Sequence, residues 1–270
     1  MNLSVLRLKS AIIGSPLEFV FKKIRRVADV LRFLRFPELQ ELSLEEVLLP
    51  KILSQILQPS SSVLDIGCHI GSFLSLAMKY SPNGRSIAIE ASPTKAAWLR
   101  QKFKNVRVLE LALSDKNGEA FFEERDDAPG YSRLQADRRS QLARSITVAT
   151  RTLDSLELPR VDLIKIDIEG GELSALRGGA GYISRARPFI IFECGPDFSL
   201  AEVGVERRDL FDCFETYGYD VFTFSDFIHK KGPLAFDEFK KCGIYPFRAF
   251  NFLGVPKETE AGSRAKQDAC

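Results

Sequence analysis

The sequence predicts an α/β fold: a mainly parallel, twisted sheet with helices on both faces and an antiparallel edge strand. Apolar runs of strand length alternate with helical patterns, and such β/α alternation gives parallel strands whose connecting helices cover both faces. The last two apolar runs have no clear helix between them, which favours an antiparallel edge. The chain of 270 residues, 45% hydrophobic and 27% charged, is long enough for one large core.

Seven segments have strand character, and helical periodicity marks most of the segments between them. The expected strands occupy residues 63–66, 86–90, 106–111, 161–167, 188–193, 219–224 and 249–254. The expected helices occupy about 44–57, 71–80, 93–103, 169–178 and 204–217. Between about 113 and 150 the alternation stops, and short extra strands at 121–122 and 146–148 flank a polar stretch. A long polar insertion of this kind is a usual place for a binding loop.

Residues 1–36 carry eight Lys and Arg against two acids. Apolar residues recur there at helical spacing, which predicts a basic amphipathic helix. An accessory helix that covers the sheet is the favoured interpretation; peripheral membrane contact and a lid over the substrate are the alternatives. We expect three parts: a basic helical extension over 1–60, the main domain over 61–256, and a polar, disordered tail over 257–270.

Charge and cysteine content argue against several classes of protein. A net charge of +2 gives no general attraction to nucleic acid, so no such partner is expected. Five scattered cysteines and two histidines argue against a disulfide framework, a zinc site or a His-rich metal site, and suit a reducing compartment. No apolar run reaches 18 residues, and Arg7, Lys9 and Glu18 interrupt the early one. We therefore expect neither a spanning helix nor a signal peptide, and a cytoplasmic location.

The first functional motif is an apolar strand that ends in Asp65 and runs into a turn bracketed by Gly67 and Gly71. The next strand also ends in an acid, Glu90. This D-x-G-x-x-x-G order favours S-adenosylmethionine, since the NAD fingerprint is G-x-G-x-x-G. We expect Asp65 to orient the glycine loop and the amino group of the cofactor. Glu90 is expected to accept hydrogen bonds from both ribose hydroxyls.

Three further residues complete the expected cofactor site. His69 stands in the middle of the glycine turn, where it either hydrogen-bonds the methionine carboxylate or packs within the loop; both interpretations stay open. Ala112 and Leu113 follow the third strand, where they are placed to contact adenine through backbone and apolar atoms.

The second motif, L-I-K-I-D-I-E-G-G-E, places acids at the carboxyl end of a buried strand, where open α/β sheets bind ligands. Alternation puts Lys165 and Asp167 on one face of this strand. Buried charges need partners, and a functional site is the usual reason for them. Glu169 and Glu172 also suit a helix N-terminus on dipole grounds.

A third buried strand ends in Glu193, which is expected to face the same cleft as Asp167. Structural pairing of Glu193 with Lys165 is the alternative. A divalent metal held by Asp167, Glu169 and Glu193 would also suit these acids, but their spacing does not establish one, and no metal site is predicted.

Together these motifs resemble the FkbM family of S-adenosylmethionine-dependent methyltransferases. The resemblance covers about 63–195 and rests on V-L-D-I-G-C-H-I-G, A-I-E-A-S, A-L-S-D, T-L-D-S-L, L-I-K-I-D-I-E-G-G-E-L-S-A-L-R-G and I-F-E. It implies the Rossmann-like class I methyltransferase fold and O-methylation of a hydroxyl on a sugar, glycan or small metabolite. Members of the family commonly carry Ala-Asn where this sequence has Cys68-His69. The resemblance therefore does not define the contacts to the methionine end of the cofactor.

For a hydroxyl acceptor we expect Asp167 to act as base or orienter, with Glu169 assisting. Lys165 is expected to hold their geometry or to neutralise the cluster. One alternative is a methyltransferase acting on protein or nucleic acid, although the amino-methylating D/N-P-P-Y/F motif is absent. The other is a non-catalytic scaffold that binds the cofactor or a membrane. The sequence predicts no oligomeric state.

Overall fold

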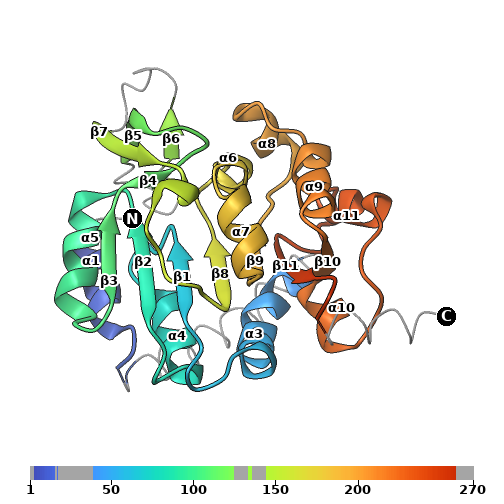
Figure 1. Ribbon diagram of the computed structural model, residues 1–270, viewed down its shortest axis with the longest axis horizontal. Helices are drawn as coiled ribbons and strands as arrows, with labels where there is room; N and C mark the ends of the chain where they lie inside the picture. Colours follow the sequence, from blue (N-terminus) through green and yellow to red (C-terminus); the bar gives the residue numbers. More distant parts are fainter. Residues whose placement is uncertain (1–2, 16, 18–38, 125–132, 136–143, 260–270) are drawn as a thin grey trace.

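The computed structural model describes residues 3–15, 17, 39–124, 133–135 and 144–259 (Figure 1). A seven-stranded sheet with the order β10-β11-β9-β8-β1-β2-β3 forms its centre. The strands are β1 (Val63–Ile66), β2 (Ser86–Glu90), β3 (Arg107–Glu110), β8 (Leu163–Ile166), β9 (Phe189–Glu193), β10 (Tyr219–Thr223) and β11 (Asn251–Pro256). Every strand that the sequence predicts is therefore present.

The described helices include each one that the sequence predicts after residue 40, whereas most of the basic amphipathic helix expected within 1–36 lies outside the described residues. They are α1 (Leu3–Ile12), α3 (Leu39–Ile56), α4 (Ser72–Tyr80), α5 (Pro93–Lys102), α6 (Glu172–Arg177), α7 (Ala180–Ala186), α8 (Asp197–Glu202), α9 (Arg207–Thr216), α10 (Phe224–Ile228) and α11 (Phe236–Cys242). The expected start of a helix at residue 169 is wrong by three residues. Glu169 and Gly170 have φ angles of 55° and 95°, which an α-helix does not allow, so α6 begins at Glu172.

The order of the strands locates the ligand-binding edge. The chain runs from β1 through β2 to β3 on one side and from β8 to β9 on the other, and all these strands are parallel. The topological switch point therefore lies between β1 and β8, where open α/β sheets bind ligands. β11 is antiparallel to both β9 and β10, which confirms the expected antiparallel edge.

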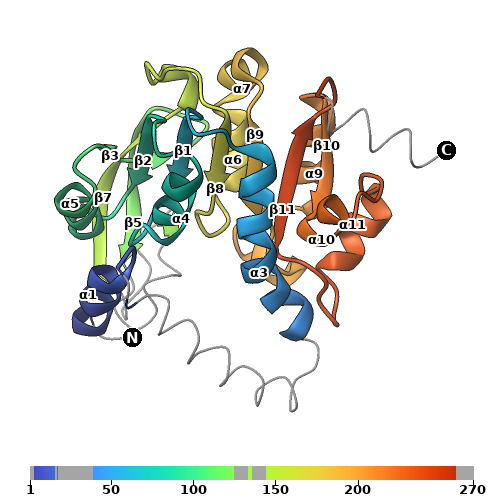
Figure 2. The same ribbon diagram turned by 90° about the horizontal axis from the view of Figure 1, so that it is seen from below.

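Helices lie on both faces of the sheet (Figure 2), and side chains that alternate along the strands divide the core between these faces. Leu64 and Ile66 belong to the core formed with α6, α7 and α9. Val63 and Leu163 belong to the core formed with α3 and α4. By the same alternation, Asp65 points to the face covered by α3 and α4.

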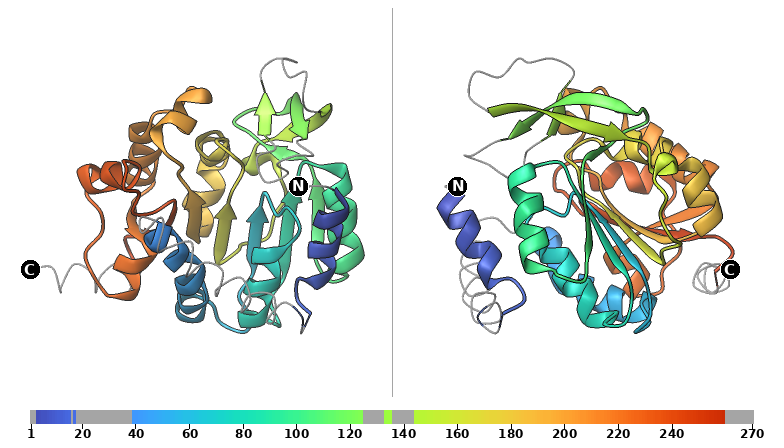
Figure 3. Two further views of the ribbon diagram at one scale, coloured as in Figure 1. Left: turned by 180° about the vertical axis from the view of Figure 1, so that it is seen from behind. Right: turned by 60° about the vertical axis from the view of Figure 1, so that its left-hand side comes forward.

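A second, four-stranded sheet lies across one end of the first (Figures 1 and 3). Its order is β4-β7-β5-β6, with β4 (Ala112–Leu113), β5 (Gly118–Glu124), β6 (Arg133–Gln135) and β7 (Arg144–Arg151). The expected extra strands at 121–122 and 146–148 are confirmed, since Phe121 pairs with Thr147 and Phe122 with Ile146.

The N-terminal segment is described only in part. Ile13, just after α1, packs against Ile70 and Trp98, beside α4 and α5. Most of the basic residues in 1–36 lie outside the described residues, as do residues 260–270 of the expected tail. The three-part division of the chain therefore stays a prediction. In the described part of the chain, every helix is too short or too polar to cross a membrane.

Candidate active site

A cavity of about 480 Å³ lies at the switch point, between the carboxyl ends of β1, β2 and β8 and the second sheet. Its volume is within the usual range of small-molecule sites. The lining residues are Ile66, Gly67, His69, Ile89, Glu90, Ala91, Lys95, Leu111, Ala112, Leu113, Ser114, Ala120, Phe122, Leu134, Asp167, Ile168, Glu169, Gly170, Gly171, Ser174 and Val203. Seven of the ten residues predicted for the site are among them.

The glycine turn presses against the loop that follows β8. Gly67 has a φ angle of 77°, and a Cβ built there would overlap the carbonyl oxygen of Asp167. Only glycine combines this backbone angle with this close approach. Gly71 also has a positive φ angle, of 81°, but its neighbour is the Phe103 ring, and it does not line the cavity. Gly67 therefore shapes the cavity, whereas Gly71 shapes the start of α4.

Glu90 lies where its carboxylate can meet a ligand. It accepts hydrogen bonds from the backbone N–H groups of His69, at 2.7 Å, and Ser92, at 2.8 Å. Burial raises its pKa, and the Lys95 ammonium and these two N–H groups act in the opposite direction. Each carboxylate oxygen has two lone pairs, so both retain acceptor capacity toward the cavity. This suits the expected contact with a ribose diol.

His69 has a φ angle of 53°, and its ring lines the cavity. Its buried Nε2 makes no hydrogen bond to any described residue. Burial lowers the pKa of the imidazole to about 4, and Lys95 adds to the effect. The ring is therefore neutral near pH 7.

The cavity has one apolar end. Ala112 and Leu113 line it, as the sequence predicts for the adenine contacts. Phe122 of β5 and Leu134 of β6 line the same end but are not predicted from the sequence. β5 precedes the polar stretch and β6 lies within it, so only the alternation of their side chains could have indicated a buried face.

Asp65 and Lys165 are direct neighbours on β1 and β8. Lys165 Nζ lies 2.7 Å from Asp167 Oδ2 and 5.6 Å from the centroid of the Phe73 ring. The Asp65 carboxylate is fully buried, and no described residue gives either oxygen a hydrogen bond of normal geometry. Burial raises its pKa, which the charge of Lys165 partly offsets. Asp65 and Lys165 lie behind the cavity wall rather than in it, so their expected roles stay predictions.

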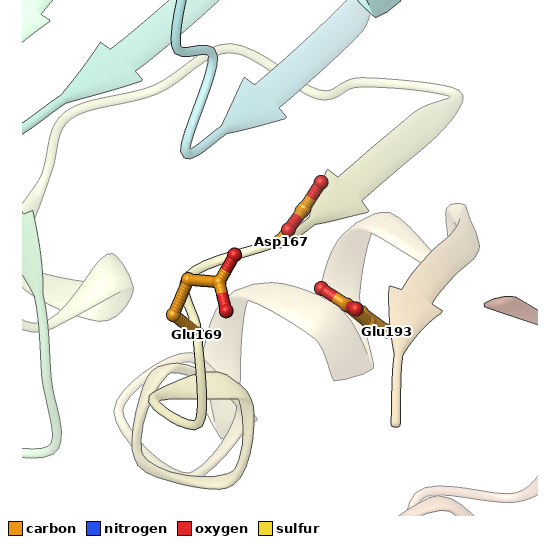
Figure 4. Close-up of side chains that lie close together, drawn as sticks. All are labelled: Asp167, Glu169 and Glu193. Atoms are coloured by element: carbon orange, nitrogen blue, oxygen red, sulfur yellow. The ribbon is translucent and has the colours of Figure 1, made fainter. Parts of the chain in front are cut away.

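Asp167, the partner of this lysine, lies close to two further acids (Figure 4). Carboxylate oxygens of Asp167, Glu169 and Glu193 all lie within 4.8 Å of one another. Burial acts to raise the pKa of Asp167, but Lys165 and a hydrogen bond from Glu193 outweigh it and hold that pKa below its usual value. Burial and the charge of Asp167 raise the pKa of Glu193. Asp167 is therefore ionised at neutral pH while Glu193 keeps its proton.

The same three carboxylates are close enough to one another to hold a divalent cation. The Lys165 ammonium pairs with one of them, Asp167, at 2.7 Å. This ion pair is the contact that the structure shows, and we propose no metal.

Glu172 has a structural role. Its carboxylate is buried and accepts a hydrogen bond of 2.9 Å from the Ile168 N–H, four residues back. Burial raises its pKa to about 7. It thereby holds the turn that presents Glu169 to the cavity.

Lys95 also lines the cavity, but the sequence did not predict it as a site residue. It lies in the first turn of α5, which Ser92 caps, and it is buried against the charges of Glu90, Glu124 and Glu169. A lysine in a helix is ordinarily exposed to solvent, so the residue type did not indicate that Lys95 would be buried at the cavity. The Ser92-Pro93 start of α5 was the available signal, because it fixes which residues of the first turn face the strand ends.

The geometry accords with a match to a known family. The family model of the methyltransferase FkbM domain matches residues 65–221, more than half of the chain. This chain belongs to the FkbM methyltransferase family. The membership confirms the predicted resemblance and the prediction of an S-adenosylmethionine-dependent methyltransferase with a Rossmann-like fold.

Individual relatives are distant. The chain is 28% identical over 187 residues to the 2-O-methyltransferase NoeI of Sinorhizobium fredii (strain NBRC 101917 / NGR234), a match that covers 62% of this chain and 76% of NoeI. Methyltransferase FkbM from Methylobacillus flagellatus KT gives a TM-score of 0.45 at 17% identity, over 73% of this chain and 44% of that chain. An S-adenosylmethionine-dependent methyltransferase from Aquifex aeolicus gives 0.41 at 18% identity, over 69% and 85%. The chain thus spans less than half of the M. flagellatus protein.

Proposed function

We propose that this FkbM-family methyltransferase transfers a methyl group from S-adenosylmethionine to a hydroxyl oxygen of a sugar, glycan or small metabolite. The single observation that carries the proposal is Asp167, a carboxylate in the cavity wall that Lys165 keeps ionised. The relative NoeI, named as a 2-O-methyltransferase, supports an oxygen acceptor.

The residues of the cavity suit this cofactor. Glu90 would accept hydrogen bonds from the ribose hydroxyls, and the apolar end beside Ala112 would take the adenine. His69, which lines the cavity on the glycine turn, would lie at the methionine end. When bound, S-adenosylmethionine supplies a methyl group on a sulfonium, so the reactivity comes from the cofactor and the orientation from the protein.

Asp167 is placed to take a proton from an acceptor hydroxyl, and an ionised carboxylate is the form that can do so. Glu169, on the adjoining turn, would orient the hydroxyl through a second carboxylate. Lys165 does not line the cavity, so we assign it the task of holding Asp167 ionised and in place. A positioned general base contributes about 10²–10⁴-fold to the rate.

The test is Asp167→Asn, assayed for methyl transfer to a panel of saccharides and hydroxylated metabolites. We expect turnover to fall about 10²–10⁴-fold, while calorimetry shows retained binding of S-adenosylhomocysteine. Asp162→Asn is the matched control, because Asp162 precedes β8 at its opposite end, where it caps the Ser62 N–H. Full activity of Asp167→Asn would contradict the role of Asp167. Methyl transfer to protein or nucleic acid in place of these hydroxyls would contradict the acceptor class.

A further inference from the structure

The lining of the cavity has two halves of different chemistry. The polar half, at the ends of β1, β2 and β8, carries the charged and polar residues His69, Glu90 and Asp167 beside the apolar Ile66, Ile89 and Ile168. The other half is apolar and is lined by Ala91, Leu111, Ala112, Leu113, Ala120, Phe122 and Leu134. Five of these, Ala112, Leu113, Ala120, Phe122 and Leu134, come from the second sheet.

The side chains of β5 alternate sharply across this sheet. Phe122 is 7% exposed and packs with Ala112 and Val148, with Ala91 and Leu134 at the edge of the cluster. Phe121, the preceding residue on the same strand, is 37% exposed. The sheet therefore turns one aromatic ring toward the cavity and the other toward solvent.

A short chain of hydrogen bonds ties this wall to the polar half. The Ser92 hydroxyl donates to Glu124 of β5, two residues beyond Phe122. The backbone N–H of the same serine donates to Glu90 at 2.8 Å. Glu124 on the second sheet and Glu90 on the first are thus held by one residue, which fixes the distance between the apolar wall and the carboxylate expected to bind ribose.

We propose that the second sheet supplies the outer wall of an adenine subsite, with Phe122 and Leu134 covering one face of the base and the Glu124–Ser92 contact holding that wall in register with Glu90. The proposal rests on the proposed use of S-adenosylmethionine. A purine is flat and apolar on its faces, and an aromatic ring beside such a face contributes stacking as well as exclusion of water. The polar half adds hydrogen bonds and charge, from Glu90 and Asp167 among others.

The experiment is calorimetric titration with two probes, S-adenosylhomocysteine and 5′-methylthioadenosine, which share adenosine but differ in the amino-acid end. Phe122→Ala is compared with Phe121→Ala on the opposite face of the same strand. We expect Phe122→Ala to lower the affinity for both probes by about tenfold or more, and by the same factor for each. Phe121→Ala is expected to stay within about twofold of the wild type.

Equal affinities of the two alanine variants would overturn the subsite. If Phe122→Ala loses its folded circular dichroism spectrum, Phe122→Leu, which keeps most of the buried volume without the ring, decides instead. Weaker binding of both probes by Phe122→Leu, with no such change in Phe121→Ala, supports the wall. Unchanged affinity of Phe122→Leu overturns it. Failure of the wild type to bind either probe would instead refute the proposed cofactor.

The Glu124–Ser92 contact is tested separately. Glu124→Ala is expected to weaken both probes several-fold, and Glu124→Gln to restore most of the affinity, because the amide oxygen can still accept from the Ser92 hydroxyl. Wild-type affinity of Glu124→Ala, or equal loss in both variants, would overturn this part of the proposal.

Discussion

Lys165 Nζ lies 2.7 Å from Asp167 Oδ2 at the carboxyl end of β8, and the two side chains share one face of the strand. On the neighbouring strand β1, Asp65 stands beside the same lysine. Glu193 at the end of β9 adds a further carboxyl group, whose field also acts on Lys165. One ammonium thus holds together a row of acids on three adjacent strands at the edge of the cavity.

Replacing Lys165 by Met should therefore destabilise the fold. Breaking a buried ion pair costs about 3–5 kcal/mol, but the side chain of Asp167 is 35% exposed, so we expect a smaller loss, about 2–3 kcal/mol. The nearby acids then repel one another, and this repulsion grows as they ionise. Urea unfolding at pH 5 and pH 8 measures the loss, which we expect to be larger at pH 8.

Lys231→Met is the control for Lys165→Met. Lys231 pairs with Asp226 at 3.1 Å, but its own side chain is 62% exposed. An exposed pair contributes about 0–1 kcal/mol. Equal losses in the two variants would show that Lys165 is no more than an ordinary surface charge.

Glu172→Gln should stabilise the protein above neutral pH. Burial raises the folded-state pKa of Glu172 from 4.5 to about 7. As the pH rises through this window, the unfolded chain releases the proton first, so the free energy of unfolding falls by about 3 kcal/mol. Glutamine carries no such charge and can still accept from the Ile168 N–H. We expect Glu172→Gln to be more stable than the wild type at pH 8 and equal to it at pH 4; equal stability at both would contradict the raised pKa.

Glu90→Ala should weaken the binding of S-adenosylmethionine by at least about tenfold, because charge-assisted hydrogen bonds contribute about 1.5–3 kcal/mol each. Glu110→Ala is the matched control. Glu110 ends β3 opposite Glu90 in the register, but its partner is Arg100 at the surface. Calorimetry with S-adenosylmethionine, and with NAD for comparison, measures the effect. Measurable NAD binding would count against S-adenosylmethionine as the cofactor, and the same affinity in both variants would count against the ribose contact.

Much of the fold was predictable because its strands are short apolar runs bounded by acids and glycines. Glu90 and Asp167 were placed near a ligand because parallel strands of one sheet end at one edge. The face to which a side chain points was harder to predict. Asp65 sits within β1 rather than at its last residue, and its side chain lies on the side of α3 and α4, behind the cavity.

The unpredicted parts of the site depend on pairing between distant segments. Phe122 reaches the cavity because β5 pairs with β7 across the polar insertion. Glu124 meets Ser92 only once that sheet lies over the first. The sequence shows a polar segment between two short strands, and neither its length nor its composition fixes where the paired strands come to rest.

Gly67→Ala should damage both the fold and the cavity. Gly67 and Gly204 have φ angles of 77° and 70°, so alanine is strained at either position. A Cβ at Gly204 meets nothing within 4 Å, whereas a Cβ at Gly67 overlaps the carbonyl oxygen of Asp167. Gly204→Ala should therefore show the backbone strain by itself, about 1–2 kcal/mol.

The difference in stability between Gly67→Ala and Gly204→Ala measures the cost of the close approach between the glycine turn and the loop that follows β8. We expect Gly67→Ala to lose about 3 kcal/mol or more of stability, and to bind S-adenosylhomocysteine more weakly than Gly204→Ala. Backbone atoms of the β8 loop cannot rotate away as a side chain can, so relief requires Asp167 itself to move. Denaturant unfolding and calorimetry measure both effects. If the two variants matched in stability and affinity, the contact between the glycine turn and the Asp167 loop would not be what positions the Asp167 carboxylate.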